Sequence, residues 1–334
     1  MKRSLMLFAA AGLLVLGQPA KAVETLKILS YLPPASVTVK EILTPFIQQV
    51  EAATKGEIKF QTYWGGSLGR DPEKQYKLLV DGIGDIVWMS NYLQGGQFPD
   101  STIFDLPNII QTSTVGSVAY WRMLKQGMLT GFDDIKVVSV YMTGLNGIHT
   151  RKAFKTLHDL KGMKIRASGP VAAEFLKQFG VVPVYMSNNA LPEALSRGVV
   201  DGLTNEWTGL TTFKIHNVVN YHYEGYVGAT SFVVGMNKKV WERLSPAAKA
   251  AIDKFSGETM ALAAGKAYDA AEISRRKPHL NDKNRVFIFP TDAEIQAVEK
   301  FAQPVYDNWI KNTPNGARKF AALKAILADI RAGK

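Results

Sequence analysis

Short apolar runs alternate with helix-like stretches along most of this chain, and this alternation constrains the fold more than any other feature. Residues 25–31, 57–64 and 84–89 have the apolar, β-branched character of strands, while 37–53 and 71–81 have the spacing of amphipathic helices. Alternating strands and helices are typical of helices layered on a sheet, rather than of a β-sandwich or a helical bundle. We therefore predict the α/β class.

A second α/β unit is predicted from about residue 147, with strands at 163–167 and 181–185. Further along, helical composition continues without a break from Pro246 to about Arg276. Roughly thirty residues at ~1.5 Å each would make a helix of ~45 Å, which is longer than one small lobe. We therefore predict two lobes with a long helix bridging both.

The first 22 residues have the composition of an export signal. Lys2 and Arg3 precede an apolar run at 5–16, and Ala20-Lys21-Ala22 offers small residues at the positions that signal peptidase reads. The apolar run is shorter than the ~20 residues that span a bilayer, so we expect a cleaved signal rather than an anchor. The predicted location is the periplasm of a Gram-negative cell, with 1–22 removed and no membrane-spanning segment.

Composition excludes several classes of function. The chain has no cysteine, so disulfides, thiolate metal sites and cysteine nucleophiles are excluded. Its formal charge of +11 falls to +8 when Lys2, Arg3 and Lys21 leave with the signal. A positive balance attracts small anions, but the basic residues are scattered singly, so we expect no nucleic-acid binding. A P-loop, an HExxH motif and a GxSxG motif are all absent, so we expect no enzyme, no cofactor and no metal site.

Residues 157–207 contain the strongest functional signal. LHDLKGMKIR places Arg166 at the end of a short apolar strand, and GVVDGLTNEW places Asn205 at the end of a strand-helix-strand unit. A guanidinium directed into a cleft binds a carboxylate through two parallel hydrogen bonds. From the residues alone, Arg166 could instead form a structural ion pair with Glu174 or Asp201, and Asn205 could cap the next helix.

Together with LKILSYLPP near the start and YWGGSLGRDPEKQYKLLVDGIGDI in the first half, this passage resembles the substrate-binding proteins of TRAP transporters, the DctP-type periplasmic receptors. The resemblance implies a two-lobe periplasmic binding protein of type II-like fold, with a long helix crossing both lobes. It also implies capture of an organic acid between two closing lobes and delivery to the TRAP membrane subunits. We assign 23–146 and 231–270 to lobe I, and 147–230 and 271–334 to lobe II.

The resemblance also implies roles for individual residues. Arg166 matches the arginine that grips the ligand carboxylate, and Asn205 matches a polar residue that contacts the ligand. His149 falls where some sialic-acid-binding members have a second arginine, so we favour a monocarboxylate carrying a hydroxyl, keto or aromatic group over a dicarboxylate. The other predicted ligand-binding residues are Tyr31, Trp88, Ser90, Asn91, Met186, Asn188 and Trp207. His149, Trp88 and Trp207 would also suit ordinary core packing.

Three other functions stay open from the sequence: an ABC-type amino-acid or carboxylate binding protein, the input module of a sensor kinase, and a periplasmic enzyme acting on a small carboxylate. An ABC-type amino-acid site normally answers the ligand ammonium with an acidic residue, and no such carboxylate stands out beside Arg166. The five histidines, at 149, 158, 216, 222 and 279, lack the helical spacing of a zinc site, which disfavours a metalloenzyme.

Overall fold

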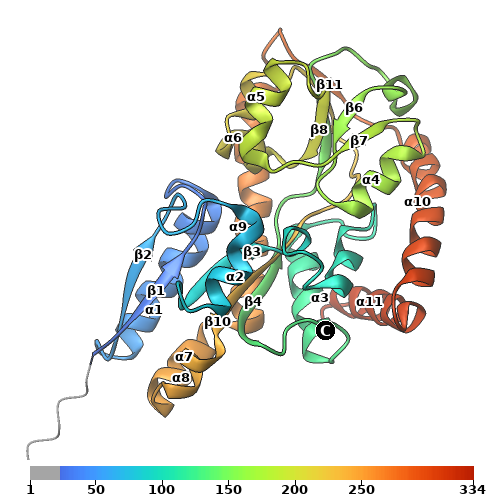
Figure 1. The fold of residues 1–334 in the computed structure, drawn as a ribbon. Coiled ribbons are helices and arrows are strands. Elements are labelled where there is room, and N and C mark those ends of the chain that lie inside the picture. Colours follow the sequence, from blue (N-terminus) through green and yellow to red (C-terminus); the bar gives the residue numbers. More distant parts are fainter. Residues whose placement is uncertain (1–22) are drawn as a thin grey trace, which may run out of the picture.

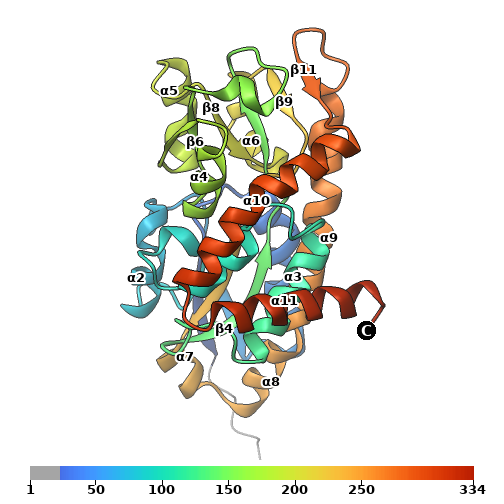
Figure 2. The same ribbon diagram turned by 90° about the vertical axis from the view of Figure 1, so that its right-hand side faces the viewer.

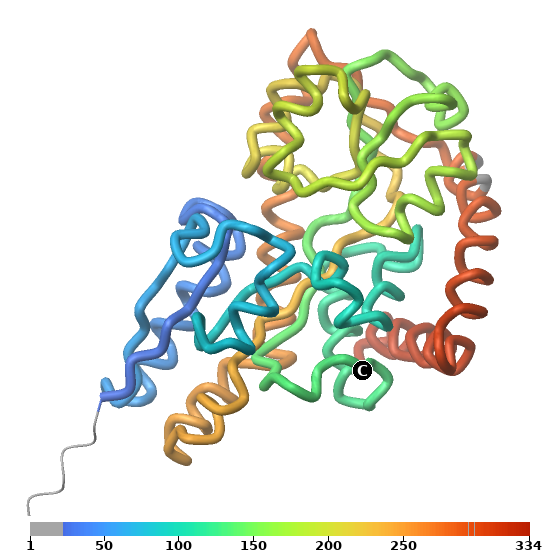
Figure 3. The backbone as a smooth tube through the Cα atoms, viewed as in Figure 1, coloured from blue at the N-terminus to red at the C-terminus, as the bar shows by residue number. Residues whose placement is uncertain are grey.

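The computed structural model describes residues 23–334, apart from the side chains of Ala293 and Ala297, and the predicted signal at 1–22 lies outside that range. Its strands form two sheets that lie one above the other in Figure 1. The first sheet has the order β2-β1-β3-β10-β4, and the second β11-β9-β5-β8-β6-β7. Figure 3 shows the chain passing from the first sheet to the second and back. The predicted α/β class is confirmed.

The first sheet combines parallel and antiparallel strands. Its strands are β1 Glu24–Leu29, β2 Ile58–Tyr63, β3 Ile86–Ser90, β4 Ile135–Met142 and β10 Ser231–Asn237. The first three run parallel, and β10 pairs antiparallel with both β3 and β4. Side chains alternate between the two faces of each strand, so the sheet buries one set of apolar residues under α1, α8 and α9 and another under α2 and α3.

The second sheet is built from shorter strands. Its strands are β5 Gly147–Thr150, β6 Lys164–Arg166, β7 Val182–Val184, β8 Gly202–Asn205, β9 Tyr221–Tyr223 and β11 Val286–Ile288. Two neighbouring segments connect the sheets, one from β4 to β5 and the other from β9 to β10. They bind each other through backbone hydrogen bonds, from Thr143 N to Thr230 O at 3.1 Å and from Asn146 N to Gly228 O at 2.9 Å.

The helices lie on the faces of the two sheets. They are α1 Thr44–Ala53, α2 Gln75–Val80, α3 Ser113–Lys125, α4 Pro170–Lys177, α5 Leu191–Ser196, α6 Trp207–Thr212, α7 Lys238–Arg243, α8 Pro246–Lys254, α9 Gly257–Arg276, α10 Asp292–Asn312 and α11 Gly316–Arg331. A π-helical turn over Thr38–Leu43 leads directly into α1, so the predicted helix at 37–53 forms with an irregular first part. Among the described residues, no helix is long and apolar enough to cross a membrane.

The predicted bridging helix exists, but it is bent rather than continuous. The segment from Pro246 is interrupted at Phe255 and Ser256, and α9 begins at Gly257, whose φ of +67° is a conformation that side chains other than glycine rarely adopt. From there α9 packs against α3 and β4 beside the first sheet and against α6 beside the second. Its two contacts with helix N-termini are specific: Asp269 accepts hydrogen bonds from Ser113 N at the start of α3, and Glu272 accepts from Trp207 N at the start of α6.

The C-terminal helices also connect the half of the molecule around the first sheet with the half around the second sheet. Figure 2 shows α10 running along the molecule toward α11, and α11 lying beside α3. Lys319 of α11 forms a buried ion pair with Asp100, which also accepts a hydrogen bond from Thr130 N. This packing places α11 beside the helices of the first sheet. The lobe boundaries at 146, 230 and 270, and the assignment of 271–334 to lobe II, stay a prediction.

Candidate ligand-binding site

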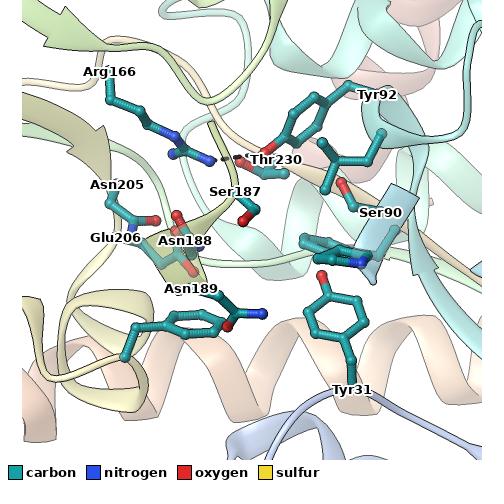
Figure 4. Close-up of a pocket in the computed structure, with 14 residues that line it drawn as sticks. Tyr31, Ser90, Tyr92, Arg166, Ser187, Asn188, Asn189, Asn205, Glu206 and Thr230 are labelled. Carbon is teal, nitrogen blue, oxygen red and sulfur yellow. Dashed lines mark hydrogen bonds between the residues drawn. The ribbon is translucent and has the colours of Figure 1, made fainter. Parts of the chain in front are cut away.

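A cleft lies between the two sheets, at the ends of their strands (Figure 4). In α/β proteins ligands bind beyond the carboxyl ends of strands, and here such ends from both sheets face each other. The cleft has a volume of about 400 Å³ when its part open to solvent is counted, which is within the usual size of small-molecule sites. The first-sheet half contributes Tyr31, Pro72, Ser90, Tyr92, Leu93, Thr230 and Phe232, and the second-sheet half contributes Arg166, Ser187, Asn188, Asn189, Asn205, Glu206 and Phe213.

Arg166 occupies one end of the cleft and is almost completely buried, with 1% of its surface exposed. Its Nε donates to the carbonyl oxygen of Met186 at 3.0 Å, its Nη1 to that of Thr204 at 3.1 Å, and its Nη2 to the hydroxyl of Tyr92 at 2.8 Å. A guanidinium has five N–H donors, so two of them are left for a ligand. Because Tyr92 belongs to the opposite half of the cleft, its bond to Arg166 joins the two halves directly.

The structure distinguishes between the two readings of Arg166. Among the described residues no carboxylate forms an ion pair with this guanidinium, and Asp201 instead pairs with Lys152 at 2.7 Å. Burying a charge without an opposite charge is costly, and such groups in clefts are typical of binding sites. The arrangement can hold an anion: a carboxylate could accept hydrogen bonds from the two remaining N–H groups and compensate the buried positive charge.

Several buried polar atoms of the cleft also have no hydrogen-bond partner within the part of the chain that the structure describes. They are the hydroxyl oxygen of Ser90, the side-chain oxygen of Asn188 and the side-chain nitrogen of Asn205. Most buried polar atoms in folded proteins are paired, so unpaired ones need an explanation. Three unpaired atoms facing one cleft indicate that it is shaped for a polar molecule.

A second hollow of about 380 Å³ adjoins the cleft and shares part of its lining. Tyr31, Asn188, Glu206, Phe213 and Phe232 line both spaces, and Trp88, Thr143 and Tyr268 are among the residues that line the second space alone. The Trp88 ring is stacked on Phe232 with 4.5 Å between centroids, and the Tyr31 ring lies 5.2 Å from Trp88. These aromatic rings form an apolar wall next to the polar end occupied by Arg166.

Of the described residues that line the cleft, Glu206 is the only acidic one, and 7% of its surface is exposed. Burial raises the pKa of its carboxyl group to about 7, against the lowering effects of its own backbone N–H and of the Arg166 charge. Burial raises the pKa of Glu272 as well, followed by repulsion from Glu206. The site therefore contains one permanent cation and a carboxyl group that changes charge near neutral pH.

Half of the ten predicted site residues line the cleft itself: Tyr31, Ser90, Arg166, Asn188 and Asn205. Trp88 lines the adjoining hollow. Asn91 lies behind the wall, where its Nδ2 donates to Ser231 Oγ at 3.0 Å. Met186 contributes its carbonyl oxygen to Arg166, while its side chain packs in the core of the second sheet.

Trp207 and His149 lie outside the cleft. The Trp207 indole donates to Glu224 at 3.0 Å, and both residues line another hollow, together with His149. His149 is buried behind Asn205 in a chain of hydrogen bonds: its Nε2 lies 3.1 Å from the Asn205 carbonyl oxygen, and its Nδ1 lies 2.9 Å from His222 Nδ1. Arg285 Nη1 lies 3.3 Å from His222 Nε2. Since an arginine donates at one end and a carbonyl accepts at the other, both imidazoles can be neutral with every contact satisfied. Burial accordingly lowers the pKa of His149 to about 4.

The sequence reasoning missed Tyr92 and Glu206 as site residues. Both positions could have been recognised, because Tyr92 lies two residues after the strand that ends at Ser90, and Glu206 directly follows Asn205. Phe232 had a weaker signal, since it belongs to β10, whose antiparallel direction brings its first residues to the same edge as the ends of β3 and β4.

Comparisons with known proteins agree with this geometry. Residues 29–312 match the DctP family, described as bacterial extracellular solute-binding protein, family 7. The chain belongs to this family. A TRAP solute-binding protein from an unidentified marine microbe, solved with 3-hydroxybenzoate, is 28% identical, covers 92% of this chain and 99% of its own, and superposes with a TM-score of 0.87. A second, from Rhodoferax ferrireducens, was solved with copurified benzoate; it is 27% identical, covers 92% and 98%, and has the same TM-score.

Among curated proteins, the C4-dicarboxylate-binding periplasmic protein DctP of Rhodobacter capsulatus is 25% identical over 293 residues, which is 85% of each chain. This receptor is thus a TRAP solute-binding protein, as the resemblance implied, and its family consists of binding proteins that catalyse no reaction. The ABC-type and enzyme alternatives are set aside on the same ground. The relatives bind small organic acids and include periplasmic proteins.

Proposed function

We propose that this protein is the periplasmic receptor of a TRAP transporter for an organic monocarboxylate, with an aromatic acid as the preferred class. The observation that supports this most strongly is the buried Arg166 guanidinium, which has two free donors and no carboxylate partner among the described residues. One cation matches one carboxylate. The aromatic wall of Tyr31, Trp88 and Phe232 offers a flat apolar surface for a ring, and two relatives were solved with benzoate or 3-hydroxybenzoate.

Asn205, Asn188 and Ser90 complete the proposed site. The side-chain nitrogen of Asn205 and the hydroxyl of Ser90 would donate to a carboxylate oxygen or a ring substituent, and the side-chain oxygen of Asn188 would accept from a ring hydroxyl; this removes the cost of leaving these atoms buried without partners. The proposed role of His149 is indirect: it holds the carbonyl of Asn205 rather than touching the ligand. For this role, His149→Ala is expected to weaken ligand binding by less than tenfold.

The proposed mechanism is closure of the two halves over the ligand. Arg166 and Asn205 would be on one half of the open protein, and Tyr31, Ser90 and Tyr92 on the other. A ligand that touches both halves favours the closed form, because only that form makes both sets of contacts. Closure also excludes water, which strengthens the attraction between guanidinium and carboxylate.

We further propose export to the periplasm with removal of residues 1–22, and transfer of the acid to the TRAP membrane subunits. Sequencing the N-terminus of the protein purified from periplasm would test the first statement, with Val23 as the expected first residue. The ligand class is tested by thermal unfolding against a panel of acids. Aromatic monocarboxylates should raise the melting temperature, since a ligand selective for the folded state stabilises it by mass action. A response to dicarboxylates, sugars or amino acids alone would contradict the proposed class.

A further inference from the structure

Glu206 stands at the junction of the two hollows. It lines the cleft that contains Arg166 and also the adjoining hollow that contains Trp88 and Tyr268. A ligand anchored at Arg166 and extending along the aromatic wall must pass Glu206. The hydroxyl of Thr143, which lines the same hollow, is buried and has no partner among the described residues. The second hollow therefore also suits a polar substituent.

Glu206 is poorly satisfied, in contrast to its neighbour Glu272. Glu272 accepts two short hydrogen bonds at the start of α6, from Trp207 N at 2.8 Å and from Thr208 N at 2.9 Å. Backbone N–H donors at a helix start stabilise the charged form of a carboxylate. The Glu206 carboxylate accepts a longer hydrogen bond, from Thr208 Oγ1 at 3.4 Å. In the free protein burial raises the pKa of Glu272 to about 8, above that of Glu206, so Glu272 holds a shared proton first. The two backbone N–H donors stabilise the Glu272 carboxylate once it ionises, whereas Glu206 lacks such donors, so Glu206 is the group that takes up a proton when a ligand carboxylate binds beside it.

The charges in the closed cleft also favour a protonated Glu206. Arg166 and a bound monocarboxylate compensate each other, so an ionised Glu206 would leave a buried negative charge without a cation beside it. Such a charge is strongly disfavoured, and a carboxyl group in that position takes up a proton instead. The protonated group offers one O–H donor and one carbonyl acceptor, which suits a hydroxyl or keto group on the ligand.

We propose that Glu206 is the second recognition group of this site and binds the ligand as a neutral carboxylic acid, so that above neutral pH the receptor takes up one proton with each monocarboxylate. This inference rests on the proposed function.

The groups around Glu206 support the proposed proton uptake. The charged or titratable groups around Glu206 are Arg166 of β6, Tyr31 after β1, Tyr92 after β3, and Tyr268 and Glu272 of α9. Burial raises the pKa of all three tyrosines, so they stay protonated between pH 6 and 8.5 and exchange no proton there.

Isothermal titration calorimetry with 3-hydroxybenzoate and benzoate tests the proposal. Titrations at pH 6.0, 7.5 and 8.5, each in two buffers of different ionisation enthalpy, give the number of protons taken up per ligand. The wild type should take up close to one proton at pH 8.5, and its affinity should fall roughly tenfold from pH 7.5 to 8.5, as linkage requires. Glu206→Gln should take up none, keep a flat affinity over this range, and bind at least as tightly as the wild type at pH 8.5.

Glu272→Gln is the matched control, because it changes the neighbouring carboxyl in the same way and should keep the proton uptake. The proposal is overturned if the wild type takes up no proton, if Glu206→Gln still does, or if Glu272→Gln abolishes the uptake. A matched ligand pair at pH 6.0 adds a second criterion: mandelate should bind better than phenylglycine, whose ammonium would require an ionised Glu206. If no carboxylate binds even at pH 6.0, the proposed receptor function fails; binding at pH 6.0 without uptake at pH 8.5 contradicts only the role of Glu206.

Discussion

Replacing Arg166 by alanine should weaken binding of an aromatic monocarboxylate by about 3 to 5 kcal/mol, the usual cost of removing one partner from a buried ion pair. This corresponds to roughly a hundredfold to several thousandfold in Kd. The size of the effect follows from burial, because the arginine is 1% exposed and lies in a cleft from which closure removes water. The ligand carboxylate would keep only neutral partners such as Asn205 and Ser90. The affinity of Arg166→Lys should lie between those of the wild type and Arg166→Ala, since lysine keeps the charge and loses the planar pair of donors.

The fold should survive this substitution. Without ligand, Arg166 is a buried charge whose partners are neutral, the carbonyls of Met186 and Thr204 and the hydroxyl of Tyr92. Removing it costs these hydrogen bonds but also removes the unfavourable burial of a charge. Thermal unfolding of the free protein should therefore show a cooperative transition in wild type and variant alike.

Isothermal titration calorimetry with benzoate is the assay. Arg197→Ala provides the matched control, because it removes the same charge from the same half of the molecule at an exposed i,i+4 ion pair with Glu193. Its affinity should equal that of the wild type. If a folded Arg166→Ala protein bound benzoate within tenfold of the wild type, the carboxylate clamp would be refuted, and the unpaired amides of the cleft would have to provide the binding energy.

Three further predictions concern closure and stability. Tyr92→Phe should weaken ligand binding about tenfold or more through faster dissociation, because it removes a hydrogen bond to the charged Arg166 that joins the two halves; unchanged dissociation in stopped-flow measurements would argue against that role. Burial lowers the pKa of His149 from 6.5 to about 4, so between these pH values the folded protein binds fewer protons than the unfolded chain. The stability that this residue contributes above pH 6.5 should therefore be lost as the pH falls through 4, by about 3 kcal/mol. Urea unfolding should show a smaller loss in His149→Gln than in the wild type. Lys319→Ala should lower the free energy of unfolding by about 3 kcal/mol, because the buried carboxylate of Asp100 loses its cation. Arg318→Ala, which changes an exposed residue of the same helix, should change the free energy of unfolding little.

Local patterns in the sequence were enough to predict much of the fold. The strands expected at 25–31, 57–64 and 84–89 appear as β1, β2 and β3, because apolar runs bounded by glycine or polar residues have few alternatives. Strand order and direction could not be read in this way, since they depend on contacts between distant residues. The bend before α9 also escaped prediction, because the composition stays helical through Phe255 and Ser256 while the backbone leaves the helix there.

The candidate site shows the same limit. Arg166 and Asn205 could be placed because each is the last residue of a strand, and the carboxyl ends of strands face the ligand cleft in α/β proteins. His149 also belongs to a strand that reaches toward the cleft, but its side chain points to the buried histidine partner behind Asn205. Adjacent residues on a strand face opposite sides, and a shift by one position separates a cleft residue from a core residue. The position of Glu206 after Asn205 could be read from the sequence, whereas its place between two hollows depends on the packing of both sheets.

A crystal structure of the protein grown with benzoate would test the central claim most directly. We predict the carboxylate at hydrogen-bonding distance from the Arg166 guanidinium, with the ring against Tyr31 and Phe232 and both halves of the cleft in contact with the ligand. Benzoate bound elsewhere, or in the cleft with its carboxylate turned away from Arg166, would contradict the account.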